Sequence, residues 1–211
     1  YYSVSEEEVT VYLEHEGQIV QIEFLNESVY TNVSIGKSGY TEVVPGQEIR
    51  YTFKDIANNS TVPLDSFYWR DTLPTDAVRL DKIITGTYSA RLNYKVVFQT
   101  NLSNTQRVLA DNLNTLQNYT LDASPAALGL ASNEYVTQVT FLFGRVPGGF
   151  RQVETPYIYC DVLSDLPHEY RFANKCDVGG MWQNQWIQAT DRWVTIIYRG
   201  GPVPTLPRTG Y

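Results

Sequence analysis

Alternation of apolar and polar residues with a period of two is the feature that most constrains the fold of this chain. It is clearest in LDKIITGTYSARLNYKVVFQT (80–100) and EYVTQVTFLFG (134–144). Successive side chains of a β-strand point to opposite faces of its sheet, so this alternation predicts strands with one buried face. Gly, Pro and Asn separate about ten such segments, which is typical of an all-β, antiparallel sandwich.

One stretch departs from this period. In TQRVLADNLNTLQNYTL (105–121), the residues Val108, Leu109 and Leu113 fall at roughly helical spacing. Two interpretations stay open, one short helix or a long polar excursion that contains a strand. The following SPAALGL (124–130) is compatible with a single helical turn packed on the sandwich.

The chain divides into three parts. Residues 1–30 contain two charged strands around a turn at Gly17, and they form either an N-terminal hairpin left from an upstream repeat or extra strands of the main sandwich. Residues 31–200 form the predicted sandwich domain. Residues 201–211 are a Pro-rich linker, since Pro202, Pro204 and Pro207 oppose a helix and favour an extended chain.

Composition argues against several functions. The net charge is −7 and the Lys and Arg residues are scattered, so no nucleic-acid partner is expected. No apolar run is long enough to span a bilayer. We find neither a catalytic motif nor metal-ligand spacing of Cys and His, and therefore expect no cofactor, no metal and no turnover of an external substrate.

The pentapeptide Leu206-Pro207-Arg208-Thr209-Gly210 resembles the LPxTG sorting signal of Gram-positive surface proteins. In that family a sortase cuts between Thr and Gly, here Thr209 and Gly210, and joins the Thr to peptidoglycan or to a lysine of another pilin subunit. The resemblance implies a location in the cell wall. The family also has an apolar segment and a basic tail after the motif, which this sequence does not include.

A second resemblance covers residues 31–200. The segments VSIGKSG, VVPGQEIRYTFKDIANNS and LDSFYWRDTLPTDAV look like the repeat domains of Gram-positive collagen adhesins and pilins. This resemblance implies an immunoglobulin-like sandwich. In such domains a Lys amine condenses with an Asn side chain to form an internal isopeptide bond, assisted by a buried Asp or Glu.

The resemblance assigns this chemistry to Lys37 and Asp71, with Asn174 in EYRFANKCDV as the preferred acceptor and Asn184 as the second choice. Burial favours the neutral forms of amines and carboxyl groups. A neutral amine is a nucleophile, and a protonated Asp71 could hydrogen-bond the Asn carbonyl and stabilise its oxyanion. The alternative is a solvated Lys37 at a sheet edge and an Asp71 that caps a turn.

Two further features stay open. Cys160 and Cys176 lie in two strands that could be linked by a disulfide, or they are two buried thiols. Trp182 and Trp186, in GGMWQNQW, form either an exposed loop that contacts a host matrix protein or glycan, or part of the packing of the sandwich.

Overall fold

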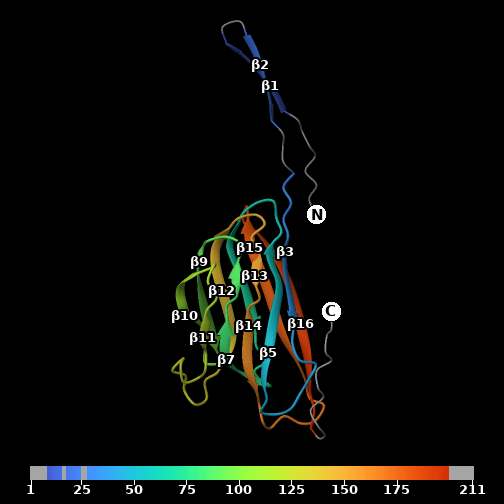
Figure 1. The fold of residues 1–211 in the computed structure, drawn as a ribbon, viewed down its shortest axis with the longest axis vertical. Helices are drawn as coiled ribbons and strands as arrows, with labels where there is room; N and C mark the ends of the chain where they lie inside the picture. The colour runs from blue at the N-terminus through green and yellow to red at the C-terminus, as the bar shows by residue number, and fades with distance from the viewer. Residues whose placement is uncertain (1–8, 16–17, 25–27, 200–211) are drawn as a thin grey trace.

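The computed structural model describes residues 9–15, 18–24 and 28–199, and it is all-β. Two sheets pack face to face around one apolar core (Figure 1). The predicted fold class, an antiparallel sandwich of the immunoglobulin-like type, is confirmed. The described residues contain no helix, and hence none that could cross a membrane.

Each sheet mixes strands from distant parts of the sequence. The larger sheet has the order β10 (Ser103–Asn114), β9 (Asn93–Thr100), β12 (Val136–Val146), β6 (Leu64–Thr72), β15 (Arg171–Trp182), β16 (Gln185–Ile197) and β4 (Glu42–Val43). The smaller sheet has the order β11 (Thr120–Asp122), β7 (Val78–Ile84), β14 (Tyr157–Val162), β5 (Glu48–Asn58) and β3 (Val33–Ser38). A short pair, β8 (Thr87–Tyr88) with β13 (Gln152–Glu154), lies outside both.

The core is aromatic on the inner face of the larger sheet. Trp69 of β6 stacks on Phe141 of β12 with ring centroids 3.9 Å apart, and Phe53 of β5 packs against Trp69 from the opposite sheet at 4.8 Å. The Trp69 indole N–H donates to the Tyr88 hydroxyl at 2.9 Å. Each fully buried aromatic side chain contributes about 2–3 kcal/mol of hydrophobic stabilisation, so this cluster holds the two sheets together.

Residues near the N-terminus form the expected hairpin. β1 (Val9–His15) and β2 (Gln18–Phe24) pair antiparallel from Val9↔Phe24 to His15↔Gln18, and this two-stranded sheet pairs with no other described strand. The two predicted strands are therefore confirmed, whereas the predicted turn at Gly17 lies outside the described residues. The division of the chain near residue 30 stays a prediction.

The helix proposed within 105–121 is wrong. Residues 103–114 form β10, which pairs with β9 at the edge of the larger sheet. Two of its register shifts lie between Val108 and Ala110 and between Ala110 and Leu113. Such bulges add residues to one strand, so apolar positions lose the period of two and imitate helical spacing. Residues 124–130 form a hydrogen-bonded turn, not a helix.

At one edge of the sandwich, β3 and β16 lie side by side, although they belong to different sheets (Figure 1). The Lys37 backbone N–H donates to Asp191 Oδ2 at 2.7 Å, and the Trp193 indole N–H donates to the Tyr40 carbonyl at 2.9 Å. The chain then crosses over, and β4 pairs parallel with β16. This crossover brings the first strand of the sandwich against its last two.

Candidate functional site

Lys37 points into the core because of its place in β3. Val33, Ile35 and Lys37 share one face of the strand, and all three are buried. The apolar residues fix that face toward the interior, so the lysine two positions later follows them. Its side chain is 0% exposed.

Lys37 meets a hydrogen-bonded pair of polar side chains from the opposite sheet, and its contact is with Asp71. Lys37 Nζ lies 2.6 Å from Asp71 Oδ1, and Asn174 Nδ2 donates to Asp71 Oδ2 at 3.2 Å. Asp71 is on β6 and Asn174 is on its neighbour β15, and both side chains lie on the inner face of their strand. The structure thus gathers an amine, a carboxyl group and a carboxamide, which we call the Lys37 cluster.

Aromatic rings enclose the cluster on the side of the smaller sheet. Lys37 Nζ lies 3.9 Å from the centroid of the Phe53 ring and 4.6 Å from that of Tyr51. Both residues are on β5, the strand that pairs with β3. These rings exclude water and attract a cation through their negative faces. Their role was not predicted from the sequence, although the alternation in EIRYTF places Tyr51 and Phe53 on one face.

The charge state of Asp71 depends on two opposing effects. Burial raises the pKa of the Asp71 carboxyl group and is the larger effect, whereas the charge of Lys37 and its hydrogen bond lower it. The net shift of the pKa is upward, toward the protonated acid. Lys37 Nζ and Asp71 Oδ1 are 2.6 Å apart, a distance over which a proton can pass directly from one to the other.

The contact between Asp71 and Asn174 differs from the predicted one. We expected Asp71 to hydrogen-bond the amide carbonyl, but it accepts from the amide nitrogen instead. Asn174 Oδ1 is buried and has no hydrogen-bond partner. An orphaned carbonyl oxygen in a dry core is costly, so its presence beside an amine is the chemically unusual feature of the cluster.

The structure distinguishes between the interpretations of Lys37 and Asp71, and between Asn174 and Asn184. A solvated Lys37 and an Asp71 that caps a turn do not fit, because both side chains are 0% exposed and contact each other. Asn184 lies in the exposed turn between β15 and β16, with φ of 65°, and is not part of the cluster. Asn174 instead contacts Asp71, the residue that Lys37 also contacts.

Of the two alternatives for Cys160 and Cys176, the structure shows two free, buried thiols and no disulfide between them. Cys160 is on β14 of the smaller sheet and Cys176 is on β15 of the larger one, where it pairs with Asp71 in register. The disulfide interpretation assumed that these two strands are neighbours, but they lie in different sheets. Burial raises the pKa of the Cys176 thiol to about 12 and that of Cys160 well above its ordinary value, so both are poor nucleophiles.

The Trp-rich segment is a β-hairpin, not a loop. Gln183 and Asn184, with φ of 45° and 65°, form the two-residue turn that joins β15 to β16. Trp182 is half-buried against the core, whereas Trp186 is 54% exposed and meets the edge of the Tyr68 ring. Of the two predicted ligand-contact residues, only Trp186 has more than half of its surface exposed to solvent.

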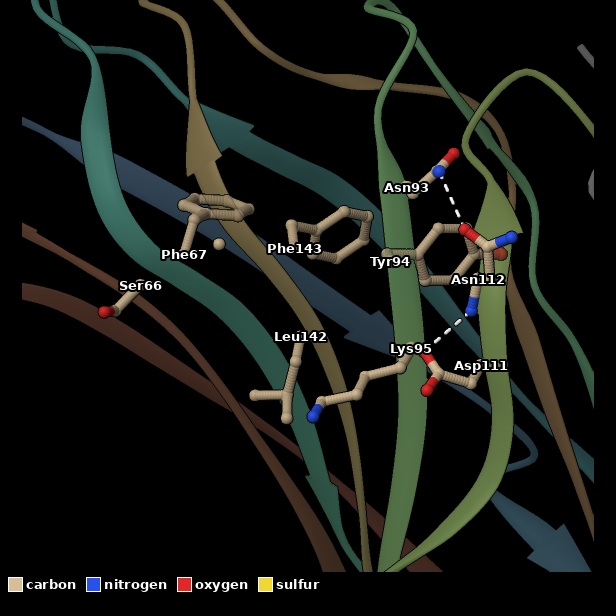
Figure 2. A pocket seen from close by; sticks show the side chains of 10 residues that line it. Ser66, Phe67, Asn93, Tyr94, Lys95, Asp111, Asn112, Leu142 and Phe143 are labelled. Atoms are coloured by element: carbon tan, nitrogen blue, oxygen red, sulfur yellow. Dashed lines mark hydrogen bonds between the residues drawn. The ribbon is translucent and has the colours of Figure 1, made fainter.

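A pocket of about 410 Å³ lies elsewhere, over β6, β9, β10 and β12 (Figure 2). Three of its lining residues, Ser66, Asn112 and Gly144, have positive φ at irregular points of their strands. At this pocket, Asn93 Nδ2 donates a hydrogen bond of 2.8 Å to Asn112 Oδ1 (Figure 2). None of its lining residues belongs to the Lys37 cluster. The described residues contain no group of side chains suited to bind a metal.

No protein-family profile and no curated protein matches this chain. Similar solved structures include the collagen-binding subdomain of the Enterococcus faecalis surface protein ACE, 11% identical with a TM-score of 0.32, covering 78% of this chain and 96% of that one. Another is the collagen-binding domain of a Staphylococcus aureus adhesin, 10% identical with a TM-score of 0.29, covering 82% and 100%.

A third is AvmM, which catalyses macrocyclization in alchivemycin A biosynthesis, 10% identical with a TM-score of 0.31, covering 92% of this chain and 99% of that one. At these values none of the three similarities carries an argument about this chain. The predicted sorting signal, residues 206–210, lies outside the described residues.

Proposed function

We propose that this chain is a domain of a cell-wall-anchored surface protein of a Gram-positive bacterium, a stalk, pilin-like or adhesive unit stabilised by an isopeptide bond between Lys37 and Asn174. The observation that carries the bond is the buried contact of Lys37 and Asn174 with opposite oxygens of Asp71. Buried ion pairs rarely improve stability over an apolar core, so a reactive role accounts better for this arrangement.

The proposed reaction is intramolecular and occurs once per chain. Asp71 Oδ1 accepts a proton from Lys37 Nζ, and the resulting amine attacks Asn174 Cγ. A bond forms between Nζ and Cγ, and the bond between Cγ and Nδ2 then breaks. Asp71 gives its proton to the leaving Nδ2, which departs as ammonia, and takes one of the two protons that remain on Nζ, while the other stays on the new amide.

Asp71 suits the role of proton shuttle because its two oxygens face the two nitrogens of the reaction. Oδ1 lies at the nucleophile Nζ and Oδ2 at the leaving group Nδ2. The upward shift in the pKa of Asp71 brings its proton affinity closer to that of an amine. No cofactor, metal or external substrate enters the reaction.

The deciding experiment is the intact mass of the purified protein, followed by peptide mapping. We expect a species lighter by one ammonia and a branched peptide that joins Lys37 to Asn174. Lys175, which is exposed on β15 beside Asn174, provides the matched control. Lys175→Arg should keep the mass loss and Lys37→Arg should abolish it. An unmodified mass for the unaltered protein would rule out the bond.

Anchoring is proposed from the sorting signal and is independent of the bond. Residues 206–210 match the substrate of a sortase, and the resulting partners are peptidoglycan or another pilin subunit. Purified protein incubated with a sortase and an amine nucleophile should gain that amine at Thr209. Thr209→Ala should not react. The absence of transfer in the unaltered protein would remove the wall-anchored part of the proposal.

A second candidate function is ligand binding by the β15–β16 hairpin. It is favoured by the exposure of Trp186, since an exposed tryptophan on a rigid turn is a common anchor for sugars and proteins. The proposed ligands are a host matrix protein or a glycan. Both functions are compatible, because the hairpin turn lies outside the Lys37 cluster.

A further inference from the structure

Two buried polar atoms near the Lys37 cluster have no hydrogen-bond partner, and they are complementary. Asn174 Oδ1 is an acceptor, and Tyr51 Oη carries a donor proton. Such orphans are rare in folded proteins because each costs about 1–3 kcal/mol. Two of them within one cluster point to a contact that forms during a reaction and not in the resting state.

We propose that Tyr51 is a catalytic residue of this bond formation, whose hydroxyl donates a hydrogen bond to Asn174 Oδ1 while that oxygen carries negative charge in the tetrahedral intermediate. This inference rests on the proposed Lys37–Asn174 bond. The tyrosine keeps its proton throughout, so it changes no bond and only stabilises charge.

The cluster needs such a donor because Asp71 is fully engaged. One of its oxygens contacts Lys37 Nζ and the other contacts Asn174 Nδ2. When Nζ attacks Cγ, the electrons of the carbonyl bond move to Oδ1. In a dry core that oxyanion requires a donor in place, since water cannot supply one.

Tyr51 is placed for this role. Its ring lies 4.6 Å from Lys37 Nζ, which contacts the same Asp71 carboxyl group as Asn174 does. Burial, together with the charges of Cys160 and Asp71, raises the pKa of Tyr51 well above its ordinary value, although the side chains of Asn174 and Thr195 lower it. The hydroxyl therefore stays protonated at every pH at which the fold is studied, as a donor must.

Tyr94 provides a matched control within the same protein. Its hydroxyl is also buried and also lacks a partner, but it belongs to β9 and packs among Tyr88, Phe141 and Phe143. Removal of either hydroxyl leaves the aromatic ring in place. Any difference between the two variants thus reports the position of the hydroxyl and not the loss of a buried polar atom.

The test is the rate of ammonia loss in Tyr51→Phe. Protein made by cell-free synthesis is quenched in acid at intervals, and the fraction with the lighter mass is measured. We expect Tyr51→Phe to form the bond about 100-fold more slowly than the unaltered protein, the typical loss for one oxyanion donor. Tyr94→Phe should form it at the unaltered rate. Equal rates for Tyr51→Phe and the unaltered protein would overturn the inference.

A folding defect is distinguished by a second pair of variants. In a Lys37→Met background no bond can form, so thermal unfolding of Lys37→Met with and without Tyr51→Phe reports the fold alone. We expect the midpoint with Tyr51→Phe to be equal or higher, because the hydroxyl makes no hydrogen bond in the resting structure and its burial is costly. A much lower midpoint with Tyr51→Phe would assign a slow rate to misfolding and overturn the catalytic role. If the unaltered protein shows no ammonia loss, the proposed bond itself has failed.

Discussion

Lys37 Nζ and Asp71 Oδ1 lie 2.6 Å apart in a part of the core that solvent does not reach. Removing both charges from water costs several kcal/mol per ion, which their mutual attraction repays only in part. An apolar pair of similar volume would be about as stable. The structure therefore contains a costly arrangement, for which the proposed reaction gives a reason that stability does not.

Asp71→Asn should prevent bond formation while it keeps the shape of the side chain. The carboxamide can neither accept a proton from Lys37 nor pass one to the leaving nitrogen, so the reaction lacks its acid and base. The intact mass should show no loss of ammonia. Removal of one partner of the buried pair should also lower the free energy of unfolding by about 3–5 kcal/mol, in addition to the contribution of the lost bond, measured by denaturant titration. Bond formation in Asp71→Asn at the unaltered rate would contradict the proposed role.

The bond should make a large contribution to stability. It closes a loop of 137 positions (174 − 37). The entropy of closing such a loop in the unfolded chain corresponds to about 5 kcal/mol. The reference is Lys37→Met with Asp71→Leu, which lacks the bond but leaves no buried charge. Its free energy of unfolding should be lower than that of the unaltered protein by about this amount, and equal values would contradict a crosslink.

Lys37→Met alone should have a pH-dependent stability of defined sign. Burial raises the pKa of Asp71, and this variant removes the two effects of Lys37 that lower it. The folded state then binds a proton more tightly than the unfolded state. The free energy of unfolding is greatest below the ordinary pKa of Asp and falls as pH rises toward the folded-state pKa, by up to about 1.4 kcal/mol per pH unit.

The variant with Asp71→Leu in addition provides the control for this pH dependence, because it differs only at the titrating group. Its curve of unfolding free energy against pH should lack the fall, and the difference between the two curves isolates Asp71. Parallel curves over the acidic and neutral range would show that Asp71 titrates alike in both states, contrary to its burial.

Trp186→Ala should weaken ligand binding by the hairpin and leave the core chemistry intact. The side chain is 54% exposed, so its loss should change the free energy of unfolding by no more than about 0.5 kcal/mol. A glycan and matrix-protein array, read with and without Trp182→Ala and Trp186→Ala together, measures the effect. Val153→Ala, at another exposed apolar residue, is the control. Binding that survives the double substitution would exclude this site.

Much of the Lys37 cluster could be predicted because its members obey the alternation of their strands. Lys37 follows Val33 and Ile35 on one face, and Asn174 lies between the buried Phe172 and Cys176. A polar residue at an inward position of a clear pattern is informative. Which carboxyl group and which amide would meet the lysine depended on the family resemblance, because pairing between distant strands leaves no local signal.

The wrong expectations, a helix within 105–121 and neighbouring strands for Cys160 and Cys176, have the same origin, because the pairing of distant strands leaves no local signal. The bulges of β10 broke its period and imitated a helix. Cys160 and Cys176 occupy consecutive long strands, and nothing local showed that these strands belong to opposite sheets. The sequence does not single out Tyr51, because a buried tyrosine is ordinary in a sandwich. Only the missing hydrogen-bond partner of its hydroxyl distinguishes it.

The position of Lys37 on the first strand of the sandwich and Asn174 on the second to last has a mechanical consequence. With the proposed bond in place, a force that enters at β3 and leaves through β16 passes directly from one residue to the other. The 136 residues between them (38–173), about 480 Å of extended chain, would carry no load and could not be drawn out. The domain would then transmit tension as a link of nearly fixed length, even where its sheets have melted.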